Sequence, residues 1–196
     1  MPKFAPRDWG WLEVIAGPMF SGKSTELIRR LVHAQIAGLR VVAFKPAIDT
    51  RSGTAEICSR IGTKIPCEII SCSDYFDAVH DYINGNLVDV LAFDEVQFFN
   101  NRKDDFPMYC AGLTSFNKRV IVAGLDTDYT GTPFETMAGL MARADFVDKL
   151  SAVCTVCGDQ AIMTARLVES SEKILIGDKE SYTALCRKCH FEHQGY

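Results

Sequence analysis

The sequence predicts an α/β fold in which helices flank a mainly parallel β-sheet, followed by a small cysteine-bearing C-terminal module. Short apolar runs at residues 88–93 and 120–123 show little alternation, which is typical of strands buried on both faces. Longer segments with helical periodicity separate several of these runs. After about residue 150 the chain becomes polar and turn-rich, so we expect one domain at residues 1–150 and a second at 151–196.

The expected elements follow in chain order. Strands are predicted at residues 12–16, 39–44, 67–70, 88–93 and 119–124. Helices are predicted at 24–37, 74–83 and 105–116, where apolar residues recur every three or four positions. A fourth helix is expected to start at Thr132, with that threonine as N-cap, Pro133 in the first helical position and Glu135 closing a capping box.

The composition excludes several classes of protein. With 196 residues, of which 47% are hydrophobic and 23% charged, the chain is neither disordered, collagen-like nor a coiled coil. Its net charge of −4 argues against a general binder of nucleic acid or anionic membranes. No run approaches the roughly 18 apolar residues of a membrane span. The N-terminus lacks the apolar core of a signal peptide, so a cytoplasmic location is expected.

A phosphate-binding motif lies between the first strand and the first helix. Gly17-Pro18-Met19-Phe20-Ser21-Gly22-Lys23-Ser24 fits the pattern G-x-x-x-x-G-K-[ST]. The glycines let main-chain amides converge on phosphate oxygens, and the N-terminus of the following helix favours the same anion. Lys23 is expected to reach the β- and γ-phosphates, and Ser24 to ligate Mg²⁺. The pattern predicts a P-loop (RecA-like) fold that binds a nucleoside triphosphate.

Two further segments are expected to face the same ligand. The apolar run at 91–93 is followed by Asp94 and Glu95. In nucleotide-binding folds of this type, the strand that carries the Mg²⁺-associated aspartate ends in the same way. Asp94 is expected near the metal, directly or through water, and Glu95 in a position to accept a proton from a nucleophile. That nucleophile is water in a hydrolase and a substrate hydroxyl in a kinase. Asp49-Thr50-Arg51 follows the second strand, where Arg51 could neutralise phosphate charge.

Four of the eight cysteines form two close pairs, Cys154-x-x-Cys157 and Cys186-x-x-Cys189. Four thiolates in a tetrahedron would hold a structural Zn²⁺ and leave no open position for catalysis. His190 competes with Cys189 as the fourth ligand, and Cys189 is favoured because it repeats the spacing of the first pair. The alternative is a redox dithiol or incidental thiols. The 28 residues between the pairs predict a long loop that the metal pins at both ends.

These motifs in this order resemble those of the zinc-containing (type II, cytosolic-type) thymidine kinases, over about residues 11–191. Besides the phosphate-binding loop, the Asp49-Thr50-Arg51 segment and the cysteine pairs, the shared motifs are Asp94-Glu95-Val96-Gln97-Phe98-Phe99, Gly124-Leu125-Asp126, Pro133-Phe134 and Tyr182 before the second pair. Gly124 stands where the family has alanine, and residues 128–132 lack the basic residues common in that loop.

The resemblance implies transfer of the γ-phosphoryl group of ATP to the 5′-hydroxyl of thymidine, giving dTMP and ADP, with deoxyuridine as a second substrate. It also implies pyrimidine deoxynucleotide salvage in the cytoplasm, structural Zn²⁺, Mg²⁺ bound with ATP, a homotetramer and feedback inhibition by dTTP. No nucleic-acid or membrane partner is implied.

The resemblance also implies roles for individual residues. Glu95 would be the general base. The nucleotide-binding residues would be Gly17, Pro18, Met19, Phe20, Ser21, Gly22, Lys23, Ser24, Asp49, Thr50, Arg51, Asp94 and Gln97. The nucleoside would contact Met19, Phe98, Leu125, Tyr129, Phe134, Thr164, Arg166 and Tyr182, together with Lys173, Ile174, Leu175, Ile176 and Gly177 of the metal-pinned loop, a lasso over the base. Zinc would be held by Cys154, Cys157, Cys186 and Cys189.

Two other functions compete with a nucleoside kinase. A P-loop ATPase or helicase-like motor would use the same Asp94-Glu95 arrangement and turn over ATP without thymidine. A zinc-ribbon module that binds nucleic acid would show tight, steeply salt-dependent binding to DNA. The net charge of −4 argues against the nucleic-acid-binding module.

Overall fold

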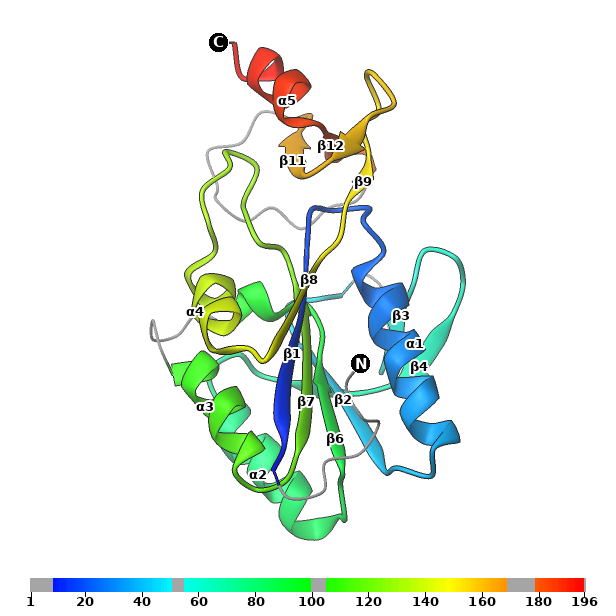
Figure 1. The fold of residues 1–196 in the computed structure, drawn as a ribbon, viewed down its shortest axis with the longest axis vertical. Coiled ribbons are helices and arrows are strands. Elements are labelled where there is room, and N and C mark those ends of the chain that lie inside the picture. Colours follow the sequence, from blue (N-terminus) through cyan, green and yellow to red (C-terminus); the bar gives the residue numbers. More distant parts are fainter. Residues whose placement is uncertain (1–8, 51–54, 100–104, 169–178, 196) are drawn as a thin grey trace.

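The computed structural model describes residues 9–50, 55–99, 105–168 and 179–195. Six parallel strands form the central sheet in the order β5-β2-β6-β7-β1-β8 (Figure 1). Their bounds are Trp11–Ala16 (β1), Val41–Pro46 (β2), Glu68–Ile70 (β5), Val90–Phe93 (β6), Arg119–Gly124 (β7) and Phe146–Lys149 (β8). The predicted parallel sheet is confirmed, and every residue of β6 and β7 is buried, as their unbroken apolar runs predict.

Helices cover both faces of this sheet, and each face has its own apolar core (Figure 1). Helix α1 (Lys23–Ile36) packs Leu27, Ile28 and Leu31 on one face. Helices α2 (Tyr75–Gly85), α3 (Asp105–Thr114) and α4 (Glu135–Arg143) cover the other. Side chains alternate along each strand, so Val14 and Ile15 of β1 enter opposite cores. The predicted fold class, helices flanking a mainly parallel sheet, is therefore confirmed.

The predicted start of the fourth helix at Thr132 is wrong. Helix α4 begins at Glu135, with Phe134 in extended conformation as its N-cap and no side-chain hydrogen bond to the cap. The reason is local competition, because Asp128 Oδ1 accepts hydrogen bonds from the N–H groups of Thr130 and Thr132 and from the Thr130 hydroxyl. Phe134 N–H donates to Asp126 O instead of entering a helix. An aspartate-centred turn thus holds the residues that would have formed the first helical turn.

Several short elements were not predicted. Strand β8 is an exposed edge strand in which only Phe146 and Val147 are apolar, and two residues are too few to show a strand pattern in the sequence. A hairpin of β3 (Glu56–Cys58) and β4 (Lys64–Pro66) follows β2, and a short 3₁₀ helix, η1 (Val96–Phe98), follows β6.

The described residues of the C-terminal module, 151–168 and 179–195, form two small antiparallel sheets and one helix. Strands β9 (Ala152–Val153) and β10 (Gln160–Ala161) form one sheet, and β11 (Met163–Arg166) and β12 (Tyr182–Leu185) form the other. They share a small core with α5 (Arg187–His193), and the module lies beyond the end of the sheet where β1 ends (Figure 1). The division into two domains at residue 150 stays a prediction.

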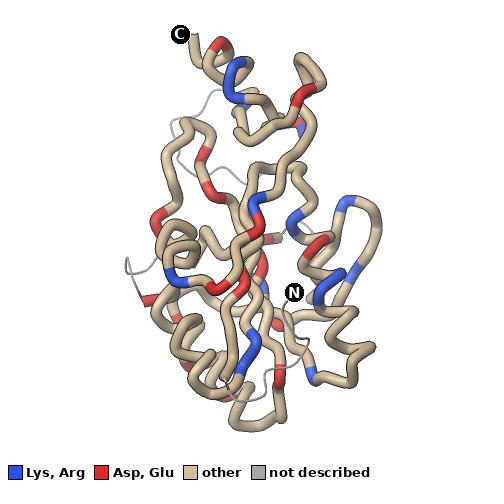
Figure 2. The backbone as a smooth tube through the Cα atoms, in the orientation of Figure 1, with Lys and Arg blue, Asp and Glu red and all other residues tan. Residues whose placement is uncertain are grey.

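Charged residues of both signs are interspersed along the chain. In Figure 2, positions of both signs occur on α1, on α4, along the sheet and in the C-terminal module. Among the residues described, no helix is both long and apolar enough to cross a lipid bilayer.

Candidate active site

The phosphate-binding loop connects the end of β1 to the start of α1. Gly17 (φ 147°) and Gly22 (φ 86°) have backbone conformations that favour glycine, and a Cβ on Gly17 would lie 2.5 Å from Leu150 O. Gly22 is the N-cap of α1, so no side chain caps the N–H groups of the first helical turn. The Nζ of Lys23, a buried residue, donates to Pro18 O at 2.7 Å, so the lysine folds back over the loop. This is the geometry of an anion site at a helix N-terminus.

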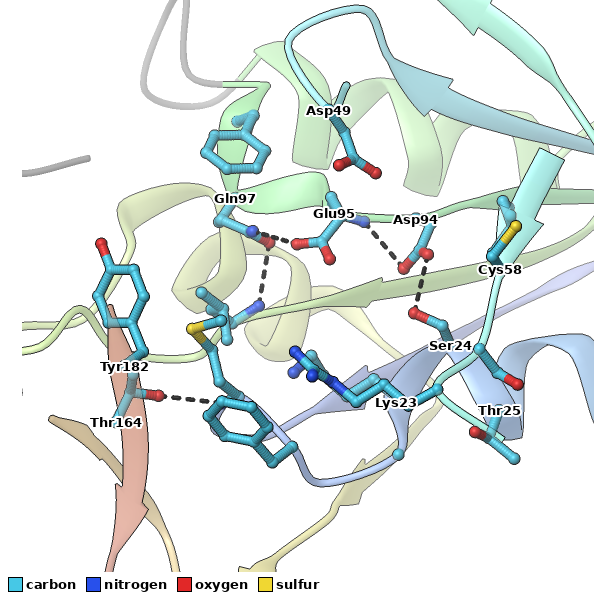
Figure 3. A pocket seen from close by; sticks show the side chains of 18 of the residues that line it. Lys23, Ser24, Thr25, Asp49, Cys58, Asp94, Glu95, Gln97, Thr164 and Tyr182 are labelled. Carbon is cyan, nitrogen blue, oxygen red and sulfur yellow. Dashed lines mark hydrogen bonds between the residues drawn. The ribbon is translucent and has the colours of Figure 1, made fainter. Parts of the chain in front are cut away.

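Asp94 directly follows β6 and faces the loop. Its Oδ2 accepts a hydrogen bond from Ser24 Oγ at 3.0 Å, and its Oδ1 accepts one from the N–H of Glu95 at 3.0 Å (Figure 3). Asp94 is buried, with 4% of its surface exposed. A serine hydroxyl beside a carboxylate offers the hard oxygen ligands that Mg²⁺ prefers, so these two residues fit the predicted metal.

Glu95 has a left-handed backbone (φ 51°, ψ 42°), a conformation that is strained for glutamate. Its Oε2 accepts a hydrogen bond from Gln97 Nε2 at 2.6 Å. The same amide uses its Oε1 to accept the N–H of Leu125 at 3.0 Å, so Gln97 connects Glu95 to the segment after β7 (Figure 3). All of Glu95 except 8% of its surface is buried. A strained, buried and oriented carboxylate is typical of a catalytic position.

A cavity of about 390 Å³ joins the loop, these carboxylates and the C-terminal module. The predicted residues that line it are Met19, Phe20, Gly22, Lys23, Ser24, Asp49, Asp94, Glu95, Gln97, Phe98, Leu125, Tyr129, Phe134, Thr164, Arg166 and Tyr182. Gly17, Pro18, Ser21 and Thr50 do not line it. Arg51 and the predicted lasso residues Lys173–Gly177 lie outside the described residues.

The C-terminal module forms one wall of this cavity. The guanidinium of Arg166 lies 3.8 Å from the ring centroid of Tyr129 and 5.5 Å from that of Tyr182. Arg166 Nη2 also donates to the Tyr182 hydroxyl at 3.1 Å, across the paired strands β11 and β12. From the same strand as Arg166, Thr164 Oγ1 accepts the N–H of Met19 at 3.0 Å, which connects the module to the phosphate-binding loop (Figure 3).

The hairpin of β3 and β4, which also contributes to the cavity, is not among the elements predicted from the sequence. Its residues 56–61 line the cavity, and the guanidinium of Arg60 lies 4.3 Å above the Phe20 ring. The sequence Ser59-Arg60-Ile61-Gly62, with a glycine in left-handed conformation, is a turn signal that could have predicted a hairpin. Nothing in that turn indicates that it faces a ligand. Thr25, Ile48, Thr127 and Asp128 are further lining residues that were not predicted.

The four predicted cysteines cluster within the C-terminal module. All the Sγ atoms of Cys154, Cys157, Cys186 and Cys189 lie within 4.8 Å of one another. Cys157 Sγ and Cys186 Sγ are 3.7 Å apart, which matches the roughly 3.8 Å between sulfurs in a tetrahedron around zinc. Burial alone would raise the pKa of the Cys154 thiol, but main-chain hydrogen bonds from Cys186, Cys157 and Val156 lower that pKa to about 6. The cluster could therefore hold a metal ion.

His190, the competing ligand, is engaged elsewhere. Its Nε2 lies 2.8 Å from Tyr129 O, where it can only donate a hydrogen bond. The Sγ of Cys189, in contrast, belongs to the cluster that could hold a metal ion.

Comparisons with known proteins identify the family. Among solved structures, the flagellar accessory protein FlaH from Methanocaldococcus jannaschii matches 78% of this chain and 76% of its own, with 14% sequence identity and a TM-score of 0.49. That likeness is too distant to bear on function. The family model described as thymidine kinase matches residues 10–190, which include the phosphate-binding loop, the carboxylate pair and all four clustered cysteines. The chain therefore belongs to the thymidine kinase family.

Proposed function

We propose that this cavity performs the reaction of the family, transfer of the γ-phosphoryl group of ATP to the 5′-hydroxyl of thymidine. The observation that carries the proposal is the position of Glu95, which lines the cavity between the phosphate-binding loop and the wall built by the C-terminal module. A carboxylate there can accept a proton from a bound hydroxyl that lies next to the γ-phosphate of a bound triphosphate.

The phosphate-binding loop and Asp94 form the donor side. The N–H groups in the first turn of α1 would receive the phosphate oxygens, and Lys23 would leave Pro18 O to reach the β- and γ-phosphates. Ser24 and Asp94, already 3.0 Å apart, would hold Mg²⁺. When bound, Mg²⁺ neutralises charge on the phosphates as the γ-phosphoryl group is transferred. Asp49 lines the same cavity and would contact the nucleotide through the neighbouring loop.

Glu95 would act as the general base. Its carboxylate would accept the proton of the 5′-hydroxyl as that oxygen forms a bond to the γ-phosphorus, while the bond to the β-phosphate oxygen breaks and ADP leaves. Gln97 would orient the carboxylate by its 2.6 Å hydrogen bond. The C-terminal module would exclude water from the bound state, since water would otherwise take the phosphoryl group.

The remaining lining residues would form the acceptor side. A nucleoside base is flat and mostly neutral, so it fits apolar and aromatic walls with a few fixed polar groups. Met19, Phe98, Leu125, Tyr129, Phe134 and Tyr182 would supply those walls, with Thr164 and Arg166 as the polar groups. A socket for the methyl group of thymine contributes only about 1–3 kcal/mol, so deoxyuridine should be a second, modestly poorer substrate.

The test is phosphate transfer from labelled ATP to a panel of nucleosides, with Glu95→Gln as the variant. The wild-type protein should consume ATP only when thymidine or, at a lower rate, deoxyuridine is present. Glu95→Gln should lower kcat by about 10²–10⁴ while ATP still binds, because only the proton acceptor is removed. Rapid ATP hydrolysis without thymidine would favour an ATPase, and an unchanged kcat in the variant would exclude Glu95 as the base.

Narrower properties that the resemblance implies belong to the same proposal. Zinc in the cysteine cluster would be measured by metal analysis of the purified protein, and inhibition by dTTP by its competition with thymidine. A homotetramer would be measured by light scattering, and the cytoplasmic location by fractionation of cells. Pyrimidine deoxynucleotide salvage would follow from the activity itself.

A further inference from the structure

Helix α5 contacts the backbone of Tyr129 and Arg166, two residues of the acceptor side of the cavity, which is called the acceptor wall below. The proposed reaction does not use these contacts. His190 Nε2 and Gln194 Nε2 both donate to the carbonyl oxygen of Tyr129, at 2.8 and 3.1 Å. His193 Nε2 lies 3.0 Å from the carbonyl oxygen of Arg166, to which it can only donate. His193 and Gln194 lie three and four positions after His190, so all three lie on one side of a single helical turn.

Tyr129 and Arg166 are the two members of the closest stack in the cavity wall. Their ring and guanidinium are 3.8 Å apart, although one belongs to the loop after β7 and the other to β11. The alignment of such a stack depends on how the two backbones are held relative to each other. Because α5 binds the main-chain carbonyl of each residue, this one helix fixes both backbones.

The other end of α5 is fixed by the cysteine cluster. Cys186 is the N-cap of the helix, and its Sγ accepts the N–H of Cys189 at 3.4 Å. Both sulfurs belong to the cluster that could hold a metal ion. The helix therefore connects the cluster directly to the Tyr129–Arg166 stack over less than three turns.

We propose that His190, His193 and Gln194 are positioning residues for the phosphoryl acceptor. Their hydrogen bonds hold Tyr129 and Arg166 in the stack. Because α5 is itself anchored at the cysteine cluster, an intact cluster is needed to keep the acceptor wall ordered. This inference rests on the proposed function, because it assigns the stack to acceptor binding. Their hydrogen bonds go to the acceptor wall, so their loss should weaken binding of thymidine and leave binding of ATP unchanged.

The test variant is His193→Ala combined with Gln194→Ala, since both side chains lie on the exposed part of the module. His190 is left in place because it is buried and adjoins Cys189. The control is Lys188→Ala combined with Glu192→Ala on the same helix, whose exposed side chains form only a 3.8 Å ion pair. In the test variant the KM for thymidine and its calorimetric Kd should rise about 5- to 20-fold, as expected for two lost hydrogen bonds.

Three further measurements separate positioning from a general loss of structure. The KM for ATP and the metal content should match those of the control variant. Amide hydrogen exchange should accelerate in residues 125–134 and 163–166 but not in β6 or β7. His193→Gln in place of His193→Ala in the test variant keeps an N–H donor on a side chain of similar reach, and it should restore the share of the thymidine affinity that is lost with the His193 donor.

The inference is overturned if the test and control variants have the same thymidine KM and the same exchange. It is also overturned if the KM values of both substrates rise together with a drop in Tm, since that result indicates a structural role only. If the wild-type protein does not phosphorylate thymidine, the proposed function fails. Amide exchange in the two segments then decides whether α5 orders the stack.

Discussion

Replacing Gln97 by leucine tests how the structure orients Glu95. Gln97 is 1% exposed, and its amide makes two hydrogen bonds in opposite directions, to Glu95 Oε2 and from Leu125 N–H. Leucine has a similar volume and makes neither bond. The substitution therefore removes the Gln97 hydrogen bond to the Glu95 carboxylate and leaves the main-chain N–H of Leu125 without its acceptor, with little change in packing.

The magnitude follows from the two bonds. A hydrogen bond to a charged group contributes about 1.5–3 kcal/mol, and an unsatisfied buried N–H costs about 1–3 kcal/mol. Part of the loss is offset because leucine is more easily buried than an amide, so we expect the free energy of unfolding to fall by about 2–4 kcal/mol. A disoriented base loses part of the 10²–10⁴ that general base catalysis supplies, so kcat should fall about 10- to 100-fold.

The assay combines urea unfolding with steady-state kinetics in both substrates. Gln97→Glu is the matched comparison, because its carboxylate still accepts the Leu125 N–H but faces Glu95 with like charge. Two carboxylates at hydrogen-bonding distance share a proton, which raises the pKa of the pair. In this variant the acidic limb of the pH–kcat profile should therefore move to higher pH, whereas Gln97→Leu should lower kcat at every pH.

The reasoning is refuted if Gln97→Leu keeps its kcat within about twofold while its stability falls as expected. Glu95 would then be held by its other contacts, and Gln97 would serve only the fold.

Three other perturbations have expected outcomes of the same kind. Gly124→Ala would place a Cβ 2.8 Å from Gln97 Oε1 and from Met137 Sδ, so the free energy of unfolding should fall by about 1–3 kcal/mol and kcat should fall with it. Urea unfolding and steady-state kinetics measure the two effects, and a fully active, stable variant would contradict the prediction. Cys157→Ser, or removal of the metal by a chelator, should weaken thymidine binding measured by calorimetry; unchanged affinity in metal-free protein would exclude the link between cluster and pocket. Hydrogen bonds from Arg29 and, against the effect of burial, from Arg30 lower the pKa of Glu26 from 4.5 to about 2. The stability that this carboxylate contributes is complete above about pH 4.5 and is lost as the pH falls towards 2, so the difference in Tm between wild-type protein and Glu26→Gln should shrink over that window.

Local patterns were sufficient for most of the scaffold. The unbroken apolar runs of β6 and β7 predict strands buried on both faces, and that is how they lie in the sheet. The stripe of Leu27, Ile28 and Leu31 likewise predicts the buried face of α1. The exposed edge strand β8 and the start of α4 were not predictable in the same way. The first has no apolar pattern, and the second depends on an aspartate-centred turn that competes with the helix.

The sequence by itself determined the chemistry of this protein: a glycine-framed loop for phosphates, two carboxylates at a strand end and four thiols in two pairs. These signals are short, because a few residues close in the chain are enough to build each anion or metal site. Only the tertiary structure decided what surrounds them. The Gln97 bridge, the wall provided by the β3–β4 hairpin and the support of Tyr129 by α5 join residues 28, about 40 and 61 positions apart. Such contacts depend on how separate elements pack against one another, and this packing produces no periodic pattern in the sequence that could predict it.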